Sequence, residues 1–82
     1  MNIYIIERTD ACDYDEYDAA VVCAENEESA RDTHPNGDPV NWAALPKYGS
    51  WVTSRDKVTV RLVGVAAPFS VAGVILSSFN AG

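Results

Sequence analysis

The chain has 82 residues, of which 48% are hydrophobic and 22% are charged, and its formal net charge at pH 7 is -6. A chain of this length predicts one domain, residues 1–82, that needs most of its aliphatic side chains for a single core, which excludes a large internal cofactor site. No apolar run reaches the roughly 18 residues that a membrane span requires, and no basic segment precedes an apolar leader at the start. We therefore expect a cytoplasmic protein that makes no contact with a membrane.

The first half of the chain predicts two strands and a helix. Residues 2–8 form a β-branched and aromatic run that is too short for a helix, which predicts a strand. Residues 17–25 predict a second strand, because Ala20, Val22 and Ala24 fall on one face of an extended segment. This strand is expected to join the first as an antiparallel hairpin. Asn26 is a good N-cap, and the acidic residues after it suit the positive end of a helix dipole, so a short helix is expected over residues 27–33.

The second half begins with a cluster of turn formers and ends in two strands. Asp38 followed by Pro39 is typical of a helix start, so a second helical turn is expected from there to Leu45. Residues 57–65 alternate in hydrophobicity with a period of two, and residues 72–79 form the last apolar run. The order strand, strand, helix, strand, strand predicts an α+β fold: an antiparallel sheet of about four strands with one or two short helices on one face.

Acidic and basic residues are unevenly distributed along the chain. Residues 1–38 hold eleven acidic and two basic side chains, whereas residues 39–82 hold one acidic and four basic side chains, so the two halves have net charges of -9 and +3. Direct binding to DNA or RNA is disfavoured, because such binding depends on Lys and Arg side chains that neutralise phosphates. We expect the partner to be a basic protein surface instead. The densest acidic stretch, residues 7–18, has a simpler alternative role as a solvated loop that keeps a small protein soluble.

Four acidic side chains between Asp13 and Asp18 invite comparison with a calcium-binding loop, since hard cations take carboxylate oxygens at alternating loop positions. An EF-hand loop that starts at Asp13 needs glycine at its sixth position, where Asp18 stands, and a bidentate Glu at its twelfth, where Ala24 stands. The pattern therefore predicts no calcium site.

The only cysteines are Cys12 and Cys23, and the only histidine is His34, so a four-ligand zinc site would need carboxylates to complete it, and the Cys-x-x-Cys spacing is missing. No residue types near them suggest an oxyanion hole, and the chain has no glycine-rich phosphate loop. We therefore expect no metal, no cofactor and no enzymatic activity. Whether the two cysteines pair is left open, although a reducing cytoplasm favours free thiols.

Trp42, Tyr48 and Trp51 lie close together in a segment rich in turn formers. Large aromatic side chains are favoured both in small cores and at interface hot spots. Core packing is the favoured interpretation here, and an interface role stays open. Tyr14 and Tyr17 alternate with acidic residues, so part of their surface is expected to be exposed beside carboxylates.

Four segments of the chain resemble a group of small acidic proteins encoded by phages and prophages: IYIIERTD at residues 3–10, CDYDEYDA at 12–19, AENEESAR at 24–31 and VILSSFNAG at 74–82. The resemblance covers the two ends of the chain, about half of its length, and leaves out the middle, residues 33–54. Small acidic phage proteins of this kind are often anti-CRISPR proteins, many of which occupy the basic nucleic-acid channel of a CRISPR effector complex. The resemblance therefore implies a non-enzymatic anti-CRISPR inhibitor that works in the bacterial host cell.

The resemblance and the charge distribution together imply a mode of action. Side chains two residues apart on an extended segment lie on one face about 6.6 Å apart, so Asp13 and Asp15 present spaced negative charges as a nucleic-acid backbone does. CRISPR effectors hold guide and target in positively charged channels, where such an acidic DNA mimic competes and blocks target DNA. The expected partner-binding residues are Asp10, Asp13, Tyr14, Asp15, Glu16, Tyr17, Asp18, Glu25, Glu27 and Glu28.

The hairpin turn and the start of the helix are expected to bring these residues onto one surface of a monomer. The alternative is a small phage accessory or structural protein-interaction module without an inhibitory role, whose acidic residues only keep it soluble. A contiguous acidic face with exposed tyrosine favours the inhibitor, whereas acidic residues scattered around the perimeter favour the alternative.

Overall fold

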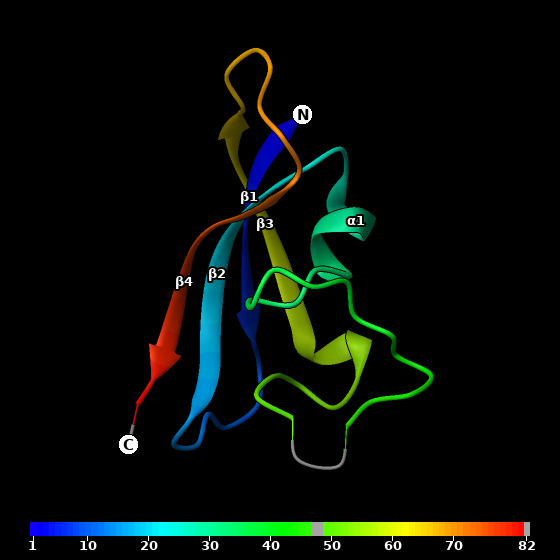
Figure 1. Ribbon diagram of the computed structural model, residues 1–82, viewed down its shortest axis with the longest axis vertical. Coiled ribbons are helices and arrows are strands. Elements are labelled where there is room, and N and C mark those ends of the chain that lie inside the picture. The colour runs from blue at the N-terminus through cyan, green and yellow to red at the C-terminus, as the bar shows by residue number, and fades with distance from the viewer. Residues whose placement is uncertain (47–48, 82) are drawn as a thin grey trace.

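A four-stranded antiparallel sheet forms the centre of the protein (Figure 1). The structure, a computed structural model, describes residues 1–46 and 49–81. It confirms the α+β fold and the predicted order strand, strand, helix, strand, strand. The elements are the strands β1 (Asn2–Arg8), β2 (Glu16–Ala24), β3 (Val58–Val65) and β4 (Gly73–Asn80), the helix α1 (Glu27–Arg31) and a 3-10 turn (Arg55–Lys57).

The strands lie in the order β3, β1, β2, β4, so β1 and β2 are central and β3 and β4 are the two edges. β1 and β2 form the predicted hairpin, in which Asn2 pairs with Ala24 and Glu7 pairs with Ala19. After β3, the chain crosses from that edge to the β4 edge through residues 66–72, which form a loop beyond the end of the sheet (Figure 1). All four strands begin and end within one residue of their predicted positions.

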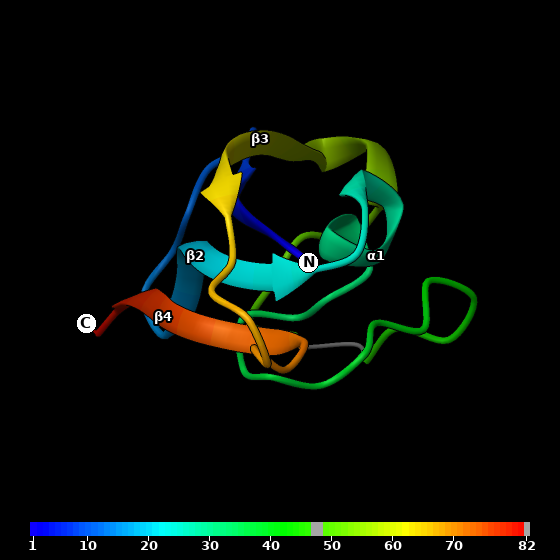
Figure 2. The ribbon, with the colours of Figure 1, turned by 90° about the horizontal axis from the view of Figure 1, so that it is seen from above.

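One face of the sheet carries the hydrophobic core and is covered by α1 and by the long connection between α1 and β3 (Figure 2). Alternate residues of the strands point into this core, and Ile6 of β1 and Val22 of β2 are fully buried. Fully burying one such aliphatic side chain stabilises the fold by roughly 1.5–3 kcal/mol. The buried core residues are Tyr4, Ile6, Ala20, Val22, Ala24, Ala30, Trp51, Val52 and Val58.

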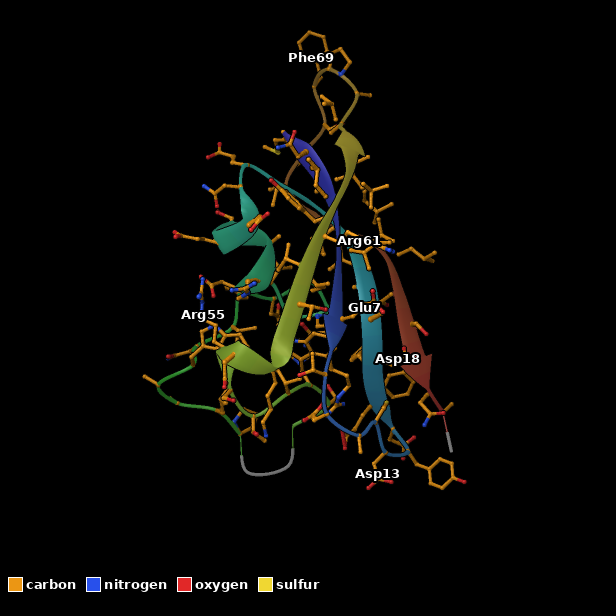
Figure 3. All side chains as sticks on the ribbon, turned by 180° about the vertical axis from the view of Figure 1, so that it is seen from behind. Glu7, Asp13, Asp18, Arg55, Arg61 and Phe69 are labelled. Atoms are coloured by element: carbon orange, nitrogen blue, oxygen red, sulfur yellow. The ribbon has the colours of Figure 1, made fainter. Side chains whose placement is uncertain are left out.

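The opposite face of the sheet has no covering layer among the described residues. Ile5, Val21 and Leu76 line a shallow groove of about 270 Å³ on this face, together with Glu7 and Arg61. In Figure 3, Glu7 and Arg61 lie on the side of the sheet away from α1. No helix in the described part of the chain is long and apolar enough to cross a membrane.

The helical segments are shorter than predicted. The start of α1 is confirmed, because Oδ1 of Asn26 accepts a hydrogen bond at 2.8 Å from a backbone N–H of the first turn. The helix ends at Arg31 and not at the predicted Thr33, because Thr33 forms an isolated β-bridge with Pro39. The same bridge keeps Pro39 extended, so the second helical turn expected to run to Leu45 is wrong.

The two tryptophans pack with the core, which is the interpretation favoured from the sequence. Trp51 is buried in the core, and Trp42 lies half-buried against it. The indole Nε1 of Trp42 donates a hydrogen bond to Oδ1 of Asp32 at 2.8 Å, which ties the connection to the end of α1. Tyr48 lies outside the described residues.

Both cysteines are free thiols. Cys12 precedes β2 and Cys23 lies near its far end, so most of the strand separates them and they do not pair. Cys23 is buried on the face of the sheet away from the core, since its neighbours Val22 and Ala24 point into the core. Its Sγ lies 3.7 Å from Sδ of Met1.

Candidate protein-binding site

Arg8, the last residue of β1, lies at the base of the predicted acidic site. Its side chain is only 6% exposed, with Nε 2.5 Å from Oδ1 of Asp10 and Nη1 2.6 Å from Oε2 of Glu16. Nη1 also donates a hydrogen bond to the Tyr17 carbonyl at 3.1 Å. The hydrogen bond from Arg8 holds the pKa of Asp10 below its ordinary value, and the same bond chiefly raises the pKa of Arg8. Asp10 and Glu16 are therefore engaged inside the protein, and Arg8 compensates part of their charge.

The turn between β1 and β2 is held by hydrogen bonds to the end of β4. The Asp15 N–H donates to the Asn80 carbonyl at 2.6 Å, and Nδ2 of Asn80 donates to the Asp13 carbonyl at 3.1 Å. Asp15 has a φ of 59°, in the left-handed region that Asp tolerates better than most residues, and there the chain reverses into β2. Asp13, Tyr14 and Asp15 are all exposed, so a fixed backbone presents them to solvent.

Asp18 adds a third exposed carboxylate beside this turn. It is the extra residue of a bulge in β2, between the pairs that Tyr17 and Ala19 form with β4. Figure 3 shows Asp13 and Asp18 toward the same end of the sheet. Within residues 1–46 and 49–81, no Lys or Arg forms an ion pair with any of the three carboxylates. Asp13, Tyr14, Asp15 and Asp18 together form the acidic turn.

Tyr17 packs inside the protein more than it faces solvent. Its ring lies edge-on to Phe79, with centroids 4.8 Å apart, and edge-on to His34, with centroids 5.7 Å apart. Its N–H donates to the Ser50 carbonyl at 2.8 Å. Tyr17 is half-buried against the core, so it joins β4 and the long connection to β2.

Glu25, Glu27 and Glu28 lie at the other end of β2, and all three are exposed. β2 starts next to the acidic turn and has nine residues, which span roughly 26 Å. α1 begins beyond the far end of the strand (Figure 1). The expected single acidic surface is therefore wrong, because the turn and the helix are attached to opposite ends of the same strand.

A cleft of about 480 Å³ lies beside the acidic turn. Tyr14, Asp15 and Glu16 line it on the side of the turn, and His34 and Trp51 line it on the side of the long connection. Burial lowers the pKa of His34 below its ordinary value, which favours the neutral ring. Arg8 also lines the cleft and pairs with Glu16, so the groups that suit a cationic side chain are the carboxylate of Asp15 and the ring of Tyr14.

Three residues of this site were not predicted from the sequence. The role of Arg8 could have been predicted, because it is the only basic residue within the acidic stretch of residues 7–18 and would be expected to pair with a neighbouring carboxylate. Trp51 belongs to an aromatic segment for which an interface role was left open, but nothing in the sequence places it or His34 beside the turn, because only the folded chain brings these distant residues there. The guanidinium carbon of Arg8 lies 6.0 Å from the centre of the Trp51 ring, which connects the two parts of the site.

No family model matches the chain, and no curated protein or solved structure matches it either. In the part of the chain that the structure describes, no three His, Cys, Asp or Glu side chains are grouped so that they could hold a metal ion. The chemistry available at the site is that of its carboxylates, its aromatic rings and Arg8.

Proposed function

We propose that this protein is a non-enzymatic inhibitor that binds a basic protein surface through its acidic turn. The proposal rests on Asp13, Asp15 and Asp18, which are exposed and have no cationic partner in the described part of the chain. Carboxylates held close together repel one another, and a surface rich in Lys and Arg relieves this repulsion. The turn needs little ordering on binding, because its hydrogen bonds to Asn80 already hold it.

The cleft beside the acidic turn gives the partner a place to insert a side chain. An Arg or Lys side chain that enters it meets the exposed carboxylate of Asp15 and the exposed ring of Tyr14, whereas Glu16 stays paired with Arg8, which also lines the cleft. A cation–π contact contributes roughly 0.5–2 kcal/mol, depending on how far the cation is desolvated. Because the inserted side chain must fit the cleft, binding depends on the shape of the partner as well as on its charge, and the protein can discriminate between basic surfaces.

The class of target follows from the resemblance to phage-encoded proteins. CRISPR effectors hold guide and target strands in positively charged channels, where the acidic turn competes for the same Lys and Arg side chains. We therefore propose an anti-CRISPR inhibitor that acts in the cytoplasm of the bacterial host and blocks target DNA binding. Since Glu25, Glu27 and Glu28 lie at the far end of β2, the proposed contact is confined to one end of the domain.

Two matched triple variants test this proposal. One neutralises three carboxylates of the acidic turn and the other neutralises three at the far end of β2: D13N/D15N/D18N and E25Q/E27Q/E28Q. Each changes the net charge of -6 by the same three units. Binding of target DNA by purified CRISPR effector complexes is measured in gel-shift assays, with circular dichroism as a control for folding.

The turn variant is expected to lose inhibition and the far-end variant to keep it. Equal effects of the two variants would exclude a specific role for the turn. If the wild-type protein inhibits none of the complexes, the proposed target class is wrong.

A structural or accessory interaction module is the second candidate. The separation of the acidic residues to opposite ends of β2 favours it, and so do exposed apolar side chains. Phe69, at the tip of the loop between β3 and β4, is fully exposed and has a φ of 67° (Figure 3). Val65 and Val71, at the two ends of this loop, are 81% and 82% exposed. Exposed apolar clusters are typical of contact with another protein. Phe69→Ser should then abolish partner capture while the D13N/D15N/D18N variant retains it, the reverse of the outcome expected for the inhibitor.

A further inference from the structure

β4 is an edge strand that lacks most of the features by which sheet edges are protected. Protected edges carry charged residues, proline or a β-bulge, or another segment covers them, and of these β4 has only a bulge at Ile75, close to its start. β4 has the sequence GVILSSFN, without charge or proline, and its residues from Ile75 to Asn80 are all exposed. β2 is its only neighbour among the described strands, and no described segment lies along its outer side in Figure 1. After a bulge at Ile75, the strand offers unpaired backbone groups beside an exposed Leu76.

The absence of charge distinguishes β4 from the other edge of the sheet. All acidic and basic side chains of the chain lie between Glu7 and Arg61, and residues 62–82 contain none. β3 carries Arg61 at its middle and follows directly after Lys57. Of the two edges, only β4 is therefore neutral along its whole length.

A neutral edge strand fits a second copy of the same chain. In a two-fold symmetric antiparallel pair, residues near the axis face the same strand of the other copy, and like charges opposite each other destabilise the pair. Pairing through β3 would bring two Arg61 side chains together, whereas pairing through β4 brings no charges together. A two-fold axis of such a pair passes through one residue position, and an axis at Leu76, next to the middle of β4, sets the two uncharged Leu76 side chains opposite each other.

The net charge of the chain does not oppose this pairing, because the acidic turn is kept away from the axis. The turn adjoins the Asn80 end of β4 through the hydrogen bond from the Asp15 N–H. Antiparallel pairing places the two acidic turns at opposite ends of the joined strands, roughly 25 Å apart. This separation exceeds the Debye length of about 8 Å at physiological ionic strength, so repulsion between the turns is largely screened.

We propose that this protein forms a two-fold symmetric dimer in which β4 pairs antiparallel with β4 of a second copy, joining two four-stranded sheets into one. The pairing satisfies the outward backbone groups of β4 and covers part of the Leu76 side chain. A monomer was the expectation from the sequence, and the exposed neutral edge is the observation that changes this expectation. The dimer leaves both acidic turns free, so it stands independently of the proposed inhibitory function.

Sedimentation equilibrium over a range of protein concentrations tests the dimer. The wild-type protein should sediment as a dimer at high concentration, and Leu76→Lys should weaken dimerisation at least about tenfold, because it sets two positive charges against each other near the axis. Leu62→Lys is the matched control, since Leu62 lies on the β3 edge and is 56% exposed, against 69% for Leu76. A wild-type protein that stays monomeric, or a dimer that Leu62→Lys dissociates and Leu76→Lys does not, overturns the proposal.

Hydrogen exchange of the wild-type protein gives an answer even if Leu76→Lys fails to fold. The outward N–H groups of β4 should exchange slowly in concentrated protein and rapidly in dilute protein, while those of β3 exchange equally in both. Equal exchange in β4 at the two concentrations overturns the proposal, even where a dimer mass is found, because the contact then lies elsewhere.

Discussion

Replacement of Arg8 by Met is expected to destabilise the fold far more than an ordinary surface substitution. Met fills a similar volume, but it removes the polar contacts of Arg8 to Asp10, Glu16 and the Tyr17 carbonyl. Hydrogen bonds to charged groups contribute about 1.5–3 kcal/mol each. The side chains of Asp10 and Glu16 are 26% and 24% exposed and can be rehydrated once Arg8 is gone. We therefore expect the free energy of unfolding to fall by about 3 kcal/mol, the lower end of the range for a broken buried ion pair.

Urea denaturation followed by tryptophan fluorescence measures this loss. A small domain has an m value of about 1 kcal/mol/M in urea, so a loss of about 3 kcal/mol lowers the midpoint by about 3 M. Arg8→Lys keeps the charge but cannot contact two carboxylates in the same fork-like geometry. Its urea midpoint should therefore lie between those of the wild type and Arg8→Met. If the midpoint of Arg8→Met lies within about 0.5 M of the wild-type value, the contacts of Arg8 do not hold the turn to the sheet.

The dependence of stability on pH gives a second measurement of the same site. The hydrogen bond from Arg8 lowers the pKa of Asp10 in the folded state, so the unfolded chain binds more protons between the folded and unfolded pKa values. The stabilisation is fully present above the unfolded pKa of about 3.9 and is lost as the pH falls through the folded pKa. The difference in unfolding free energy between wild type and Arg8→Met should therefore shrink below about pH 4.

Three further substitutions test single contacts. Asn26→Ala removes the N-cap of α1 and should lower the free energy of unfolding by about 1 kcal/mol in urea titrations, whereas Asn26→Asp should keep the cap. Trp42→Phe removes the hydrogen bond to Asp32 and should also lower the free energy of unfolding by about 1 kcal/mol. Burial lowers the pKa of His34, so its contribution to stability is complete above about pH 6.5 and declines as the pH falls toward the folded pKa. Thermal melts of His34→Gln should lack this decline.

The strands could be predicted because each is marked by residues that act locally. In β2, alternation already indicated that Ala20, Val22 and Ala24 share one face, and all three are buried in the core. The missing second helical turn shows the limit of such signals. Asp38 and Pro39 form a good helix start by local preference, but the bridge between Pro39 and Thr33 forms only when the chain returns past the end of α1.

The position of the acidic turn could be predicted, but the division of its carboxylates could not. Arg8 engages Asp10 and Glu16 because the hairpin brings the start of β2 back beside the end of β1, and the composition of the chain does not reveal which carboxylates then reach Arg8. Asp13 and Asp15 are exposed at the turn, and no Lys or Arg of the described residues forms an ion pair with them. Likewise, whether the acids of α1 join those of the turn depends on the length of β2, which places them at opposite ends.

Asn80 allows the effect of charge on partner binding to be separated from the effect of a fixed turn. Asn80→Ala removes the side-chain hydrogen bond to the Asp13 carbonyl but leaves every carboxylate and the backbone hydrogen bond from Asp15 in place. Charge sets the association rate with a basic surface, so this rate should stay unchanged. Dissociation should become about fivefold faster, because about 1 kcal/mol of hydrogen bonding no longer orders the turn before binding. Surface plasmon resonance on an immobilised effector complex resolves the two rates, and an unchanged dissociation rate would mean that charge alone accounts for binding.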